Sequence, residues 1–197
     1  AYRLANQLVK KAGARIGSLS KAARGYLLAG KSLLEPFTQM HYVSLQSDFN
    51  VGQALYRSLE SGVRHWQHNE ACLNFQPSVR AVQGMADGIQ MVRVVLEQLI
   101  ENGVGERRLL TNISQITNKL QWLKRFEGLD ELTAEDGAYH RALKRYSKLY
   151  ESLVDSQEDV IRLSEVTELV HSVSYQKTVL ELSEFLLKEE MTEELEQ

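Results

Sequence analysis

The sequence is poor in the residues that interrupt helices and in the residues that cross-link chains. Its 197 residues include 2 prolines, 12 glycines and one cysteine, Cys72. So little proline and glycine is typical neither of a low-complexity chain nor of a turn-rich β-sandwich, and it favours helices. A single cysteine cannot form a disulfide within the chain, so we expect a reducing, intracellular compartment and a buried thiol.

Long apolar runs are also missing. The longest ones, such as Val94–Leu96, cover only a few residues, whereas a helix that spans a bilayer needs roughly 20. The basic N-terminal region has neither the apolar block nor the small-residue cleavage site of a secretory signal. We therefore expect a cytoplasmic protein that meets a membrane only at its periphery.

Apolar residues recur at steps of three and four along most of the chain, which is the spacing of one helix face. In residues 2–34 this spacing predicts a basic first helix of about nine turns, followed by a break near Pro36. Its apolar side is formed by Ala5, Leu8, Ala12, Ile16, Leu19, Ala23 and Tyr26.

The middle of the chain repeats the same spacing in two blocks. Asn50 is the predicted N-cap of a helix that runs to about Cys72, with Val51, Leu55, Leu59, Val63 and Trp66 on one side. After Pro77, residues 78–126 form heptad helices that are interrupted at Asn102–Gly103. Their predicted core positions are Val82, Met85, Ile89, Val92, Leu96, Leu99, Leu109, Ile113, Ile116, Leu120 and Leu123.

The last segment, residues 133–195, is predicted as a long helical region that is acidic after residue 150, and the polar residues 155–159 leave open whether it is continuous or broken there. Its predicted core positions include Val170, Val173, Leu180 and Leu186. No run alternates with a period of two, and no segment repeats at a fixed spacing. We therefore predict one all-α domain over residues 1–197, built as an elongated antiparallel helical bundle or coiled coil of four to six helices.

Charge is distributed unevenly along the chain. Residues 1–34 hold seven basic side chains and no acidic one, whereas residues 151–197 hold thirteen acidic and three basic side chains. At about 100° per residue, two basic stripes form, each opposite an apolar face. The N-terminal stripe contains Arg3, Lys10, Lys21, Arg24 and Lys31, and the second stripe contains Arg141, Lys144, Arg145 and Lys148.

These stripes have two interpretations. They are either solvated faces that pair with acidic side chains of neighbouring helices, or a surface that binds anionic lipid headgroups. Nucleic acid is a weaker hypothesis, because the sequence pI is near 6.0 and nucleic-acid-binding domains are usually basic.

Two short segments resemble a known family. The run from Tyr2 to Gly13, continued at Ala22–Leu33, resembles the first helix of BAR domains, and Ala138–Leu149 resembles a Tyr-x-x-Ala-Leu-x-Arg-Tyr-x-x-Leu stretch of their second long helix. The resemblance implies a crescent-shaped antiparallel homodimer that binds curved, anionic membrane. It assigns headgroup contacts to Lys21, Arg24, Lys31, Arg141, Lys144, Arg145 and Lys148. The chain departs from the family at Asn50, Pro77 and Gly103, where residues that end helices interrupt its middle part.

Residues with catalytic or metal-binding chemistry are scattered. His65 and His68 share a helix face near Glu70, but a zinc or di-iron site would need further ligands from a second helix. Cys72 near His68 has a spacing that matches no nucleophile motif, and Gly84 and Gly88 lie in a predicted core helix rather than in a phosphate loop. We therefore expect no enzyme, no cofactor and no metal.

The sequence thus favours a dimeric, non-enzymatic scaffold that binds anionic membrane through Lys10 and the seven basic residues that the BAR resemblance assigns to headgroups. The alternative is a helical adaptor bundle that binds another protein through its acidic last helix or an exposed apolar face.

Overall fold

The computed structural model describes residues 2–17, 40, 43–75, 77–121 and 157–195. All regular secondary structure in these ranges is helical. The helices are α1 (Tyr2–Ala12), α3 (Val51–Phe75), α4 (Val79–Glu101), α5 (Arg107–Lys119), α9 (Gln157–His171) and α10 (Val173–Leu195). The prediction of an all-α helical bundle is confirmed, with six helices in the ranges that the structure describes.

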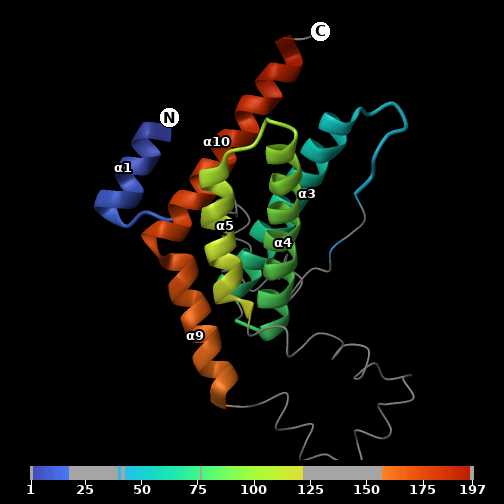
Figure 1. Cartoon of the computed structure of the whole chain (residues 1–197). Helices are drawn as coiled ribbons and strands as arrows, with labels where there is room; N and C mark the ends of the chain where they lie inside the picture. The colour runs from blue at the N-terminus through green and yellow to red at the C-terminus, as the bar shows by residue number, and fades with distance from the viewer. Residues whose placement is uncertain (1, 18–39, 41–42, 76, 122–156, 196–197) are drawn as a thin grey trace, which may run out of the picture.

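The helices form an up-and-down bundle with one helix attached to its outside. In Figure 1, α3, α4 and α5 run alternately down, up and down, and α9 continued by α10 runs up beside them. The short helix α1 lies on the outer side of α10, away from α3 and α4. The fold therefore has a central bundle and a peripheral N-terminal helix.

The start of α3 is capped as the sequence predicts. The Asn50 side chain accepts a hydrogen bond from the Gln53 amide at 2.8 Å, and the Gln53 side chain accepts one from the Asn50 amide at 3.0 Å. This reciprocal pair satisfies two amides that the helix itself leaves without acceptors. Asn50 is confirmed as the N-cap, although Val51, predicted on the apolar side, is 71% exposed because it lies in the first turn.

The predicted core positions of α4 and α5 are also confirmed. In α4 the six apolar positions from Val82 to Leu99 are all buried, and in α5 Leu109, Ile113 and Ile116 are buried. Ser78 caps α4 by accepting from the Ala81 amide at 3.1 Å. Gly103 follows α4 with φ of +82°, a conformation that glycine adopts without steric cost. Leu123 lies outside the described residues.

Three glycines let α3 and α4 approach each other closely. A Cβ atom at Gly88 would lie 2.6 Å from the Trp66 amide nitrogen and 2.9 Å from the Gly62 carbonyl oxygen. At Gly84 it would lie 2.6 Å from the Asn69 side chain. The two backbones therefore meet where a side chain would hold them apart.

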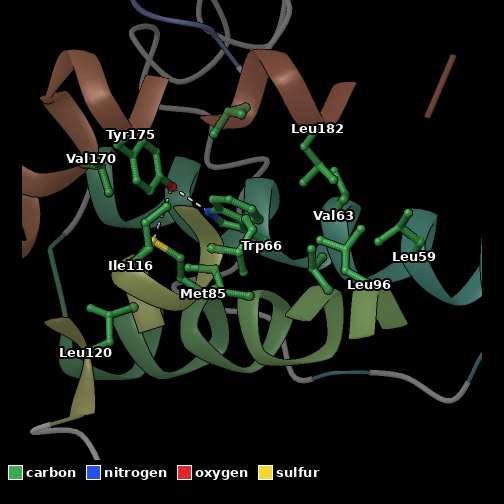
Figure 2. Packing of buried hydrophobic residues seen from close by; sticks show 14 of the residues in the cluster. Leu59, Val63, Trp66, Met85, Leu96, Ile116, Leu120, Val170, Tyr175 and Leu182 are labelled. Carbon is green, nitrogen blue, oxygen red and sulfur yellow. Dashed lines mark hydrogen bonds between the residues drawn. The ribbon is translucent and has the colours of Figure 1, made fainter. Parts of the chain in front are cut away.

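One hydrophobic core joins α3, α4, α5, α9 and α10. Its largest fully buried side chain, Trp66, packs edge-on against Tyr175 of α10, with ring centroids 5.6 Å apart. Figure 2 shows Met85 and Ile116 around this pair and Leu59, Val63, Leu96 and Leu182 further along the core. Trp66, taken from the sequence as a core residue, is confirmed as one.

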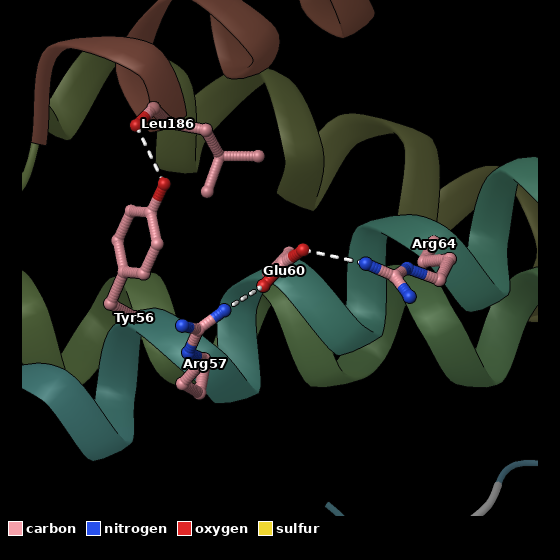
Figure 3. Close-up of polar contacts among 5 residues, drawn as sticks. All are labelled: Tyr56, Arg57, Glu60, Arg64 and Leu186. Carbon is pink, nitrogen blue, oxygen red and sulfur yellow. Dashed lines mark hydrogen bonds and ion pairs between the residues drawn. The ribbon is translucent and has the colours of Figure 1, made fainter. Parts of the chain in front are cut away.

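One hydrogen bond near the start of α3 connects it to the C-terminal part of α10. The Tyr56 hydroxyl donates to the Leu186 carbonyl at 2.9 Å (Figure 3). Beside it, Glu60 bridges Arg57 at 3.0 Å and Arg64 at 2.6 Å, all on α3. Exposed pairs of this kind contribute little to stability, so the Tyr56 bond is the contact here that joins two helices.

The prediction of one helix through residues 2–34 is wrong. α1 ends at Ala12, Gly13 has φ of +59°, and residues 14–17 are not helical. The predicted apolar face is also misplaced, because Leu8 is 47% exposed while Val9 is buried. Glycine at this point terminates the helix, so Ile16, the next predicted apolar position, is not part of α1. Residues 18–39 lie outside the described ranges.

Within residues 157–195, the C-terminal region breaks at Ser172, between α9 and α10, where the sequence predicts no interruption. Residues 155 and 156 of the polar segment lie outside the described ranges. The Ser172 hydroxyl accepts from the Tyr175 amide at 3.3 Å and donates to the Leu169 carbonyl at 2.7 Å, so it caps the start of α10. The break shifts the helical phase: Val173, predicted in the core, is 44% exposed, whereas Tyr175 is buried. Val170 and Leu180 are buried as predicted.

We expect Gly88→Ala to lower the free energy of unfolding by about 1–3 kcal/mol or more, because the added methyl group forces α3 and α4 apart. Urea unfolding measures this loss. Gly52→Ala is the control: its Cβ would meet only the Asn50 side-chain oxygen, at 3.3 Å. If both variants unfold at the same urea concentration as the wild type, the close approach of α3 and α4 is wrong.

Candidate functional site

The helix α1 exposes leucines on the outside of the bundle. Leu4 is 61% and Leu8 is 47% exposed, one helical turn apart, while the next residue, Val9, is 3% exposed. Leucine side chains on a surface lose the free energy that burial would provide, about 1.5–3 kcal/mol each. Two of them side by side on one short helix therefore mark a surface suited to an apolar environment.

Basic side chains lie on the same short segment as these leucines. Arg3, Lys10 and Lys11 of α1 and Arg15 just beyond it are all exposed. Among the side chains that the structure describes, which do not include those of residues 157–161 and 189–195, no ion pair joins any of these four cations to an acidic group. We call the exposed set Leu4, Leu8, Arg3, Lys10, Lys11 and Arg15 the α1 surface.

The α1 segment is held to the bundle through a buried glutamine. The Ile16 amide donates to the Gln176 side-chain oxygen at 2.7 Å, and the Gln176 side-chain nitrogen donates to the Val170 carbonyl at 2.7 Å. The break at Ser172 leaves that carbonyl without its usual helical donor. The Gln176 side chain, which is 2% exposed, thus replaces the missing donor to the Val170 carbonyl and also binds the N-terminal segment.

Most of the predicted headgroup-binding residues lie outside the described ranges. Lys10 is described and exposed in the last turn of α1. Lys21, Arg24 and Lys31 fall in residues 18–39, and Arg141, Lys144, Arg145 and Lys148 fall in residues 122–156. The structure therefore describes one member of the predicted set, together with Arg3, Lys11 and Arg15.

A second unusual feature is a carboxyl group in the core. Glu70 of α3 is 7% exposed and accepts a hydrogen bond from the Tyr175 hydroxyl of α10 at 2.6 Å. That hydroxyl in turn accepts from the Trp66 indole nitrogen at 2.5 Å, as Figure 2 shows. The indole, the phenol and the carboxyl form a chain of hydrogen bonds between α3 and α10.

Burial changes the pKa values of Glu70 and Tyr175 in this chain of hydrogen bonds. Desolvation raises the pKa of Glu70 to about 7, partly opposed by the hydrogen bond from Tyr175. Burial and the neighbouring Glu70 charge raise the pKa of Tyr175 well above its ordinary value. Glu70 is therefore the group of this cluster that changes charge near neutral pH.

The other candidate groups are built into the packing. Cys72 is 2% exposed, as expected for a buried thiol, and desolvation raises its pKa, which disfavours a reactive thiolate. His65 is buried beside Asn69, whose side-chain nitrogen donates to the His65 carbonyl at 3.1 Å. In the part of the chain that the structure describes, no three His, Cys, Asp or Glu side chains are grouped to hold a metal ion.

The sequence places Glu70 at a core position of α3, although the apolar residues alone do not point to it. Continuing the α3 spacing from Val63 through Trp66 by four residues reaches Glu70, and three more reach buried Leu73. A carboxyl at a core position of a heptad pattern indicates a buried polar contact. Its partner could not be found from sequence, because the break at Ser172 determines which face Tyr175 occupies.

No protein-family model matches the chain, and neither does any solved structure. The resemblance to BAR domains, and the homodimer that it implies, stay predictions. No helix in the described ranges is both long enough and apolar enough to cross a membrane.

We predict that Glu70 makes the protein less stable as pH rises. The folded state holds the Glu70 proton with a pKa of about 7, above the ordinary value of 4.5 for a glutamate. Its contribution to stability is therefore fully present below pH 4.5 and is lost as pH rises to about 7. Glu70→Gln, which still accepts from Tyr175, should exceed the wild type by less than about 1 kcal/mol at pH 5 and by up to about 3 kcal/mol at pH 8.

Urea unfolding at both pH values measures the difference, and Glu168→Gln, an exposed site on α9, is the control. An equal gain from Glu70→Gln at pH 5 and pH 8 would contradict the buried acid.

We also predict that Tyr175→Phe costs about 1–3 kcal/mol for each buried group that it leaves without a partner. The loss should be larger at pH 8 than at pH 5, because the ionised Glu70 then lacks its donor. The matched control is Tyr56→Phe, which removes a hydroxyl bonded to the Leu186 carbonyl rather than to an acid. Its smaller loss should not depend on pH; if the losses from both variants vary alike with pH, the link to Glu70 is wrong.

Proposed function

We propose that this chain is a non-enzymatic helical scaffold that binds anionic membrane surfaces peripherally through α1 and the basic stripes. The observation that supports it best is the α1 surface. Two exposed leucines lie on one short helix whose basic side chains have no acidic partner among the side chains that the structure describes. Interfacial helices combine an apolar face, which enters the acyl boundary, with Lys and Arg, which contact anionic headgroups.

The charges and the leucines act together in this proposal. Each Lys or Arg near an anionic surface contributes about 1 kcal/mol, and leucine side chains that enter the interface add their transfer free energy. Neither contribution alone holds a protein on a membrane for long, but attachment becomes stable when two kinds of signal combine. The second basic stripe, which lies outside the described ranges, would add to the first.

The burial pattern of α1 supports an orientation in which its two leucines face away from the bundle. Val9 faces inward against the bundle, while Leu4, Leu8, Lys10 and Lys11 remain outside. A protein-binding adaptor is the alternative function, but the cations on the same short segment as the leucines, which pair with no acidic side chain that the structure describes, favour lipid headgroups over an apolar protein groove.

The test is co-sedimentation with vesicles of phosphatidylcholine, with and without phosphatidylserine, at low and moderate salt. We expect the wild type to pellet with the anionic vesicles and to be released by salt. Lys10→Glu with Lys11→Glu should lower the affinity at least about 30-fold, since two headgroup contacts are lost. Leu4→Ser with Leu8→Ser should weaken binding at both salt concentrations, because apolar contacts are not screened.

Arg107→Glu with Lys119→Glu is the matched control, since both residues are exposed cations on α5 and the change in net charge is the same. Changing Arg141, Lys144, Arg145 and Lys148 together to Glu tests the second stripe. If the wild type stays in the supernatant with anionic vesicles even at low salt, the membrane proposal is wrong and the adaptor hypothesis replaces it. Equal losses from the α1 and α5 variants would show that only net charge matters.

A further inference from the structure

The attachment of α1 to the bundle depends on few contacts. Val9 is the only residue of α1 that is buried, and it lies outside the main hydrophobic core. Ile16 packs against that core, and its amide is bonded to Gln176. An element with so few buried side chains belongs to the least stable part of a fold.

The same attachment hides part of the apolar face of α1. At about 100° per residue, Leu4, Leu8, Ala12, Ala5 and Val9 fall on one continuous arc of the helix. The docked helix turns the Val9 edge of this arc toward α10 and leaves the leucine edge outside. A bilayer would take up the whole arc only if α1 left α10.

Gln176 contacts the N-terminal segment directly, and we assign Leu180 to the same surface of α10 from its position along the helix. Gln176 binds the Ile16 amide, and Leu180 is one turn further along the same face of α10. Like Val9, Leu180 is buried but lies outside the main core. Changes at these α10 positions therefore weaken the docking of α1 without altering α1 itself.

We infer that α1 is a latch: it docks on α10 through Val9, Ile16 and Gln176, and it releases from α10 to place its full apolar arc in an anionic bilayer. This inference rests on the proposed membrane binding. Docking and insertion compete for Val9, so the apparent affinity for a membrane is reduced by the fraction of molecules in which α1 is docked. Gln176 and Leu180 set that fraction.

The first test measures affinity for phosphatidylserine-containing vesicles with the full chain. Gln176→Ala should raise the affinity about three- to tenfold, the change that losing one hydrogen bond makes in the docking equilibrium. Leu180→Ala should also raise it. Thr178→Ala, which removes a hydroxyl bonded only within α10 at the Ser174 carbonyl, is the control and should leave the affinity unchanged. Gln176→Ala and Leu180→Ala binding like the wild type would overturn the latch.

The second test needs no substitution, and it stands if Gln176→Ala fails to fold. Hydrogen exchange of the wild type is followed with and without the same vesicles. Release predicts that the Ile16 amide exchanges faster on vesicles, while the amides of α1 gain protection and those of α4 do not change. An Ile16 amide that stays protected on saturating vesicles would overturn the latch but leave membrane binding intact. Absence of vesicle binding by the wild type would instead overturn the proposed function itself.

Discussion

At Ser172 the chain leaves the helix for a single residue, and much of the rest of the structure depends on that break. Ser172 ends one helix and caps the next, so α10 starts in a new phase. The new phase turns Tyr175 into the core and leaves Val173 outside. It also frees the Val170 carbonyl, which Gln176 then satisfies. One interrupted turn therefore positions both the partner of Glu70 and the anchor of the N-terminal segment.

The buried carboxyl of Glu70 occupies a position where an apolar side chain would be simpler. Moving a carboxylate out of water is unfavourable, and the raised pKa of Glu70 reflects that cost. The Tyr175 hydroxyl offsets part of it and also accepts from Trp66, so three side chains from two helices satisfy one another. Such a network constrains how α10 fits against α3, because a rotation of either helix would leave buried polar groups without partners.

The core and the candidate membrane surface are built differently. Where α3 and α4 meet, Gly62, Gly84 and Gly88 bring the backbones together, and the contact tolerates no added methyl group. At the edge of the fold, α1 is joined through one buried valine, Ile16 and one side-chain hydrogen bond. A well-packed bundle that carries a basic helix held by few buried contacts is the arrangement that the proposed release of α1 requires.

The sequence by itself determined the fold class and the local signals. Heptad spacing identified the cores of α4 and α5, and Asn50 and Gly103 marked helix ends, because these features depend only on near neighbours in the chain. The sequence also placed Lys10 among exposed basic residues. The apolar spacing overestimated the length of the first helix, since the same spacing continues past Gly13, where the helix has already ended.

Tertiary structure decided the rest, and the reason is that the contacts involved join distant parts of the chain. The partner of Glu70 is 105 residues away and that of Ile16 is 160 residues away. Which face of α10 meets them follows from the phase shift at Ser172, and a count of apolar spacing cannot supply that shift. The exposure of Leu4 and Leu8 was likewise decided by α10, which covers one side of an apolar arc that the sequence alone shows as a single face.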